Sequence, residues 1–431
     1  MMIFPWSPFG AWGGTLRSLV RQLSGTSQLP LYELDLQNVL DRKGKIRPFV
    51  NPRGFTRDPK CLPLGRTPDS LKFRAWELAH AIKKADCANQ VPSHILFVWS
   101  FGFLLESVTV FNWSLNDFRL EDGMANFYAD FSRTSLAGRV GQGMSFLFME
   151  KQGYPFGERF FPPQPLKKVK SPRKSKIPDF RFDDRNGTWS LVESKGSFVS
   201  PGKDPNIKEV LNDALNQLRE WKYPKSFAVG TFLREKSDGS HEPSLLAFVD
   251  PEDEEIPPPS PADAVRRGNY ADWLYGMGFA EAASDLRLRR IRLEQDSISF
   301  RKVRLGREDY VFVILYSRLF PISEDRLLFD WWELMEWEMR GYLGFPRGIT
   351  FGIMGIKLST MHQISESLRS DQEEPLMRLE IPRERPELEW PVMLENEAKL
   401  DGSLFSDGTF LGELTIAGGS LARFGVEEIL L

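Results

Sequence analysis

The chain has 431 residues, which suits two or three domains of ordinary size. Hydrophobic residues make up 41% of it, with 33 Phe and 12 Trp, so the composition indicates an ordered globular protein and excludes a disordered one. The formal net charge of −3 means that attraction to nucleic acid or to an anionic membrane would need local patches of charge. Two cysteines exclude a disulfide framework and fit a reducing compartment, and no apolar run has the length of a membrane span. We therefore expect a cytoplasmic protein that makes no contact with a membrane.

The first part of the chain, residues 1–115, is rich in aromatic residues and turn signals. We expect it to form an N-terminal domain or subdomain of its own. Within it, the segment Pro68–Ala85 predicts a helix capped by Asp69 or Ser70.

Residues 116–250 predict the order helix, strand, strand, helix, strand, strand. Apolar residues at helical spacing run through Gly138–Tyr154 and end at Gly153. Two short strands, PDFRF and TWSLVES, are joined across Asn186-Gly187, a strong hairpin turn signal. Asp204 then caps a helix with one broad apolar face, and KSFAVGTFL and SLLAFVD follow as strands.

An acidic and proline-rich segment at 251–263 predicts a linker, because it can form neither a helix nor a central strand. Beyond it, residues 264–431 predict a mixed α+β accessory domain. Its strands are expected at YVFVILYS, GITFGIMGI and LFSDGTFLGELTI, and a helix is expected over Glu324–Leu343.

Three charged residues on the predicted hairpin are the strongest functional signal. Glu193 and Lys195 are two apart on one strand, so their side chains face the same side, and hairpin pairing brings Asp179 beside them. Two carboxylates and the backbone carbonyl of Ser194 make an oxygen-rich site suited to Mg²⁺ or Mn²⁺. The lysine can position water and offset charge on a phosphorus centre. A solvated sheet surface with alternating charges is the simpler alternative.

This element order, with IPD on one strand and ESK on the next, resembles the PD-(D/E)XK nuclease superfamily over roughly residues 138–250. The resemblance implies a restriction-endonuclease-like α/β (α+β) core, a mixed central sheet flanked by helices. It implies that Asp179 and Glu193 are metal ligands, that Lys195 is the motif lysine and that Gln217 on the following helix assists.

Many members of that superfamily also carry a glutamate on the first core helix, and here the matching position holds Gln142. Glu150 lies eight residues further along the same helix, about 12 Å away along the axis, so both cannot reach one metal ion. Either Gln142 suffices, or one metal ion is held less tightly, or Glu150 is the missing ligand.

A basic run directly before Asp179 bears on the substrate. It holds no acidic residue and six basic ones, which are Lys167, Lys168, Lys170, Arg173, Lys174 and Lys176. Lysine and arginine contacts to phosphates supply affinity that does not depend on sequence. We therefore expect nucleic acid as the partner, with DNA favoured over RNA, although a mobile solvated loop would explain the run as well.

Together these features predict a DNA endonuclease that depends on Mg²⁺ or Mn²⁺. The resemblance further implies a role in prokaryotic restriction, phage defence, mobile elements or repair, with a partner ATPase or helicase because the chain has no Walker motif. A homodimer would explain double-strand cleavage. The rival interpretations are a catalytically weak nuclease-like subunit that binds nucleic acid or acts as a scaffold, and a transposase-type subunit that uses the same site.

Overall fold

The structure is a computed structural model. It describes residues 25–33, 70–86, 110–113, 116–124, 130–161, 177–203, 205–218, 221, 225–237, 243–249, 261–292, 296–317, 349–369, 375–382, 388–394, 398–416 and 424–431. The basic run Lys167–Lys176, the predicted N-cap Asp204, most of the predicted linker and the predicted helix Glu324–Leu343 lie outside the described residues.

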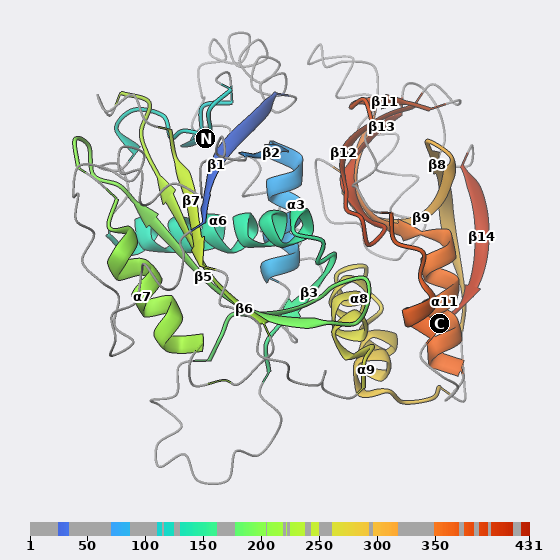
Figure 1. The fold of residues 1–431 in the computed structure, drawn as a ribbon. Coiled ribbons are helices and arrows are strands. Elements are labelled where there is room, and N and C mark those ends of the chain that lie inside the picture. Colours follow the sequence, from blue (N-terminus) through green and yellow to red (C-terminus); the bar gives the residue numbers. More distant parts are fainter. Residues whose placement is uncertain are drawn as a thin grey trace, which may run out of the picture.

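The first of two seven-stranded sheets has the order β2-β1-β7-β6-β5-β4-β3 (Figure 1). It is mixed, because β1 pairs with β7 and β5 with β6 in parallel while the other pairs are antiparallel. Its strands are β1 Thr26–Glu33, β2 Ser70–Arg74, β3 Phe156–Arg159, β4 Phe180–Asp183, β5 Trp189–Phe198, β6 Lys225–Leu233 and β7 Leu245–Val249.

Helices cover both faces of this sheet. α3 (Ala75–Asp86) and α6 (Asp130–Lys151) lie on one face, and α7 (Ile207–Leu218) lies on the other (Figure 1). α7 buries Leu211, Ala214 and Leu215 against Leu191 and Ala228 of the sheet. The six elements predicted from 138 to 250 are confirmed in type, but the prediction missed β3, which lies between α6 and β4. The mixed sheet with helices on both faces is the coarse architecture that we expected.

The predicted helix over Pro68–Ala85 is wrong in its first part. Residues Ser70–Arg74 form β2, and the helix begins only at Ala75. Leu71 and Phe73 are buried while Lys72 is exposed, so the segment alternates as a strand does and pairs with β1. β1, β2 and α3 all come from the first 115 residues, yet the two strands extend the same sheet that holds β4 and β5.

The second sheet is antiparallel throughout, with the order β11-β12-β13-β10-β9-β8-β14, and it curls strongly (Figure 1). The part of the chain that forms this sheet also contains the helices α8 (Ala264–Gly276), α9 (Ala280–Leu288) and α11 (Leu358–Arg369). Its strands are β8 Ser297–Leu305, β9 Glu308–Ser317, β10 Ile349–Lys357, β11 Val392–Met393, β12 Ala398–Leu404, β13 Thr409–Ile416 and β14 Gly425–Leu430. The strands expected at YVFVILYS and GITFGIMGI are confirmed, whereas LFSDGTFLGELTI contains the last residue of β12, a hairpin turn and then β13.

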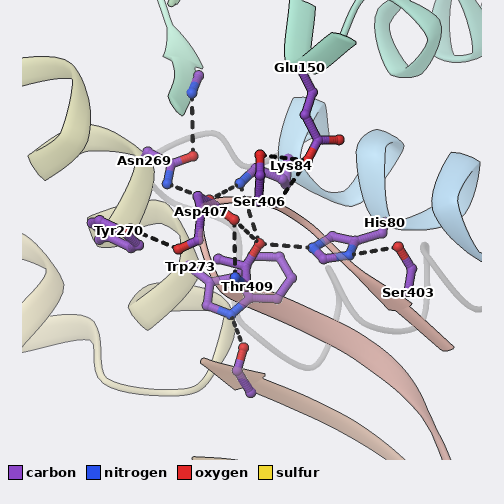
Figure 2. A network of polar contacts seen from close by, with 12 residues as sticks. His80, Lys84, Glu150, Asn269, Tyr270, Trp273, Ser403, Ser406, Asp407 and Thr409 are labelled. Atoms are coloured by element: carbon purple, nitrogen blue, oxygen red, sulfur yellow. Dashed lines mark hydrogen bonds and ion pairs between the residues drawn. The ribbon is translucent and has the colours of Figure 1, made fainter. Parts of the chain in front are cut away.

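The turn between β12 and β13 joins the two halves of the molecule (Figure 2). Asp407, which is buried, forms an ion pair with Lys84 of α3 and accepts a hydrogen bond of 2.8 Å from Asn269 of α8. The Tyr270 hydroxyl donates to the backbone carbonyl of Asp407 over 2.8 Å. Since these groups are buried, each needs its partner, and the network holds α3, α8 and the second sheet in one arrangement.

Candidate active site

The β4–β5 hairpin brings the predicted acidic residues together. Phe180 pairs with Val192, so Asp179, the residue before β4, lies beside Glu193 on β5. The turn forms because the Asp184 carboxylate accepts hydrogen bonds from two backbone N–H groups of the turn and because Gly187 takes a φ of 84°. The hairpin predicted from Asn186-Gly187 is therefore confirmed.

An arginine of α8, in the C-terminal part of the chain, holds the turn of this hairpin. Arg266 of α8 forms a buried ion pair with Asp183, with 2.8 Å between Nε and Oδ2. The Arg266 guanidinium also donates to the backbone carbonyls of Asp184 and Arg185, over 3.1 and 3.0 Å. Because a guanidinium offers five donors in a fixed plane, one arginine fixes the end of β4 and the turn together.

Each of the two carboxylates is bonded to the backbone beside the other. The Asp179 N–H donates to Glu193 Oε2 over 3.2 Å, and the Ser194 N–H donates to Asp179 Oδ2 over 3.0 Å. Glu193 is only 1% exposed. These reciprocal bonds fix both carboxylates at the same end of β4 and β5, as the sequence predicts.

Lys195 occupies the centre of a cluster of acceptors. Its ammonium lies 2.8 Å from Glu193 Oε1, 2.6 Å from Gln217 Oε1 and 3.1 Å from Asp213 Oδ2. The resemblance implied that Gln217 lies at the site, whereas Asp213 was not identified as a site residue from the sequence. The signal was available, because Asp213 lies four residues before Gln217 and so faces the same side of α7.

Burial and mutual repulsion set the protonation of this cluster. The pKa of Glu193 is raised to about 7, first by burial and then by the negative charge of Asp179, against the opposing effect of Lys195. Burial also raises the pKa of Asp179, although the Ser194 N–H and the Lys195 charge counteract it. Burial lowers the pKa of Lys195, but its contacts with Glu193 and Asp213 outweigh this effect, so the pKa is raised overall.

The first core helix approaches the site closely enough to need glycine. A Cβ atom on Gly196 would lie 1.7 Å from the carbonyl oxygen of Ala137, and one on Gly141 would lie 2.9 Å from the Gly196 nitrogen. One turn further along α6, the Ser145 hydroxyl donates to Ser194 Oγ over 2.9 Å. The α6 backbone therefore packs directly on β5 next to Lys195.

The structure separates the two candidates for an α6 ligand. Gln142 is half-buried and follows Gly141, so it lies in the turn of α6 that contacts β5. The Glu150 carboxylate accepts hydrogen bonds from the Ser406 backbone N–H, over 2.7 Å, and from its hydroxyl, over 2.8 Å (Figure 2). The Glu150 carboxylate thus belongs to the contact between α6 and the second sheet.

The donors present suit one hard cation with few protein ligands. Among the described residues, no group of three or more His, Cys, Asp and Glu side chains is arranged to hold a metal ion. Glu193 is nevertheless buried beside half-buried Asp179, and the negative charge of Asp179 helps to raise the pKa of Glu193. Mg²⁺ typically takes one or two carboxylates and completes its shell with water and substrate phosphates, so this pair fits it.

Comparison of the chain with protein-family models, with curated proteins and with solved structures found no match. Within the part of the chain that the structure describes, no helix combines the length and the apolar character needed to cross a bilayer.

Proposed function

We propose that this protein is a metal-dependent nuclease that hydrolyses phosphodiester bonds, with DNA as the favoured substrate. The convergence of Asp179, Glu193 and Lys195 at one end of the β4–β5 hairpin carries the proposal. The Lys195 ammonium lies 2.8 Å from Glu193, and two hydrogen bonds to backbone N–H groups hold the Asp179 and Glu193 carboxylates beside each other, an arrangement that matches the needs of hydrolysis at phosphorus. A core with helices on both faces of a mixed sheet supports the same conclusion.

Each residue has a role that follows from its position. Asp179 and Glu193 would hold Mg²⁺ or Mn²⁺, and the ion would supply stabilisation of negative charge on the phosphate. Lys195 orients the attacking water and offsets charge on the phosphorus centre. Gln217 and Asp213 fix the lysine side chain from α7, so that its ammonium stays beside Glu193.

The first test incubates the purified protein with plasmid, linear duplex, single-stranded DNA and RNA. Each substrate is tested with Mg²⁺, with Mn²⁺ and with a chelator. The proposal requires cleavage with metal and none with chelator. Intact substrates in every mixture, from a protein shown to be folded, would reject it.

The second test replaces the three residues one at a time. Asp179→Asn, Glu193→Gln and Lys195→Met should each lower the cleavage rate by about 100-fold or more, because the groups act on one phosphate as a unit. Asp309→Asn is the matched control, since Asp309 forms an exposed ion pair with Arg304 in the second sheet. A wild-type rate in any of the three folded variants would contradict the assignment.

A second candidate function is a non-catalytic nuclease-like subunit that binds nucleic acid or acts as a scaffold. The observation that favours it is the neutral Gln142 on α6, which leaves two carboxylates rather than three near the expected metal ion. This subunit would bind nucleic acid with equal affinity in the wild type and in Glu193→Gln, and neither protein would cleave. A role in restriction, phage defence or mobile elements, with a partner ATPase or a second copy of the chain, is compatible with both candidates.

A further inference from the structure

A second cation, Arg159, lies next to Asp179 at the end of β3. In the β3–β4 pair Arg159 is directly opposite Phe180, the residue that follows Asp179. The next residue along the chain, Phe160, donates its backbone N–H to the Asp179 carbonyl over 3.1 Å. The backbone at Arg159 is therefore fixed beside the backbone at Asp179.

Arg159 and Lys195 approach Asp179 from opposite faces of the sheet. Residues that pair directly across an antiparallel ladder share a face, so Arg159 is on the face of Phe180, which packs on Phe146 of α6. Lys195 is on the other face, where it contacts Asp213 and Gln217 of α7. The carboxylate of Asp179 thus has a cationic side chain on each side.

The donors of Arg159 are not used within the described part of the protein. The guanidinium lies over the Phe180 ring, 5.6 Å from its centroid, and the buried Nε has no hydrogen-bond partner among the residues that the structure describes. Neighbouring arginines differ: Arg181 forms an ion pair with Glu158, and Arg139 forms one with Asp86. A buried donor without a partner destabilises a fold, so an external acceptor is the expected partner.

The positive charge of Arg159 indicates which kind of acceptor it binds. The backbone pairing places Arg159 beside Asp179, and within the described residues no ion pair joins the two side chains. A planar guanidinium binds the two non-ester oxygens of a phosphate through parallel hydrogen bonds.

We propose that Arg159 binds a backbone phosphate of the nucleic-acid substrate, next to the scissile bond and on the side of Asp179 opposite Lys195. This inference rests on the proposed function, and it adds a substrate-binding residue that the hairpin motif does not contain. It places the strand that is cut at the edge of the sheet, next to the end of β3.

The test measures binding separately from cleavage. Fluorescence anisotropy follows a labelled short DNA duplex and a labelled single strand, with Ca²⁺ in place of Mg²⁺, over a range of salt concentrations. The variants are Arg159→Gln and Arg159→Lys. Arg307→Gln is the matched control, because Arg307 is exposed in the turn between β8 and β9.

Arg159→Gln should weaken binding by about tenfold or more and reduce the slope of log affinity against log salt by about one. Arg159→Lys keeps the charge without the planar fork and should recover only part of the affinity. Arg307→Gln should bind as the wild type does. Thermal unfolding of each variant confirms that it is folded, and if Arg159→Gln does not fold, the partial loss in Arg159→Lys is the deciding measurement.

Two outcomes separate this inference from the proposed function. A wild type that cleaves, with affinity and salt slope unchanged in both Arg159 variants, overturns the role of Arg159 and leaves the nuclease intact. A folded wild type that neither binds nor cleaves any of the nucleic acids overturns both.

Discussion

Replacing Gly196 by alanine should separate α6 from the strand that carries Glu193 and Lys195. The new Cβ atom would lie 1.7 Å from the Ala137 carbonyl oxygen and 2.4 Å from its carbon. Since Cβ atoms do not approach other heavy atoms within 3.0 Å, the helix would have to move by at least 1.3 Å, the difference between the two distances. Backbone lies on both sides of this contact, so no side chain can rotate to relieve it.

The expected loss in the free energy of unfolding is about 3 kcal/mol, the upper end of the usual cost of overpacking. Gly138→Ala on the same helix is the matched control, because its Cβ would meet nothing within 4 Å. There the better helix propensity of alanine should stabilise the protein by about 1 kcal/mol. Urea unfolding followed by tryptophan fluorescence measures both, and the 12 tryptophans provide the signal.

The same displacement should lower cleavage, because it moves Ser145 away from Ser194 and loosens the strand beside Lys195. A Gly196→Ala protein whose stability lies within about 0.5 kcal/mol of the wild type would refute the close packing of α6 on β5.

Three further predictions test other parts of the molecule. Gln142→Glu should lower the Mg²⁺ concentration needed for half-maximal cleavage, because it adds a negative ligand. Glu150→Gln should leave that concentration unchanged, since Glu150 is bonded to Ser406. Measuring the cleavage rate over a range of Mg²⁺ concentrations compares the two variants. Replacing the six basic residues of Lys167–Lys176 by glutamine should weaken binding to all DNA sequences alike and flatten its salt dependence, and an unchanged salt slope would count against a phosphate-binding role. Burial raises the pKa of Asp272 to about 7, so the folded protein retains a proton that the unfolded chain has released. The free energy of unfolding of the wild type should therefore fall relative to that of Asp272→Asn as the pH rises from about 4 to about 7, by up to about 4 kcal/mol, and should not change further above pH 7. Urea unfolding at a series of pH values measures this difference, and a difference that does not vary with pH would contradict the prediction.

The local elements around the site could be predicted because their signals are local. Asn186-Gly187 is a sufficient signal for the turn in the sequence, and the two strands on either side alternate or run apolar as their burial requires. Glu193 and Lys195 share a face by the geometry of any strand. The pairing of Asp179 with Glu193 follows from the hairpin register alone.

The rest depends on contacts between distant segments. The helical spacing of Pro68–Ala85 concealed β2, which forms because β1 offers a partner and the core accepts Leu71 and Phe73. Strand β1 contains Pro30, a residue that argues against a strand in the middle of a sheet. Arg159 carries no motif, and only the pairing of β3 with β4 places it beside Asp179.

The attachment of the hairpin turn to Arg266 has a consequence for synthesis of the protein. A nascent chain that ends near residue 250 already contains Asp179, Glu193, Lys195 and Gln217, but not the arginine that neutralises buried Asp183. The Arg266 guanidinium itself donates to the carbonyl of Leu376, over 2.9 Å, which the ribosome adds more than 100 residues later. A buried carboxylate without its cation is strongly destabilising. The support of the β4–β5 hairpin is therefore complete only after Leu376 has been added, and a fragment that ends near residue 250 would lack it.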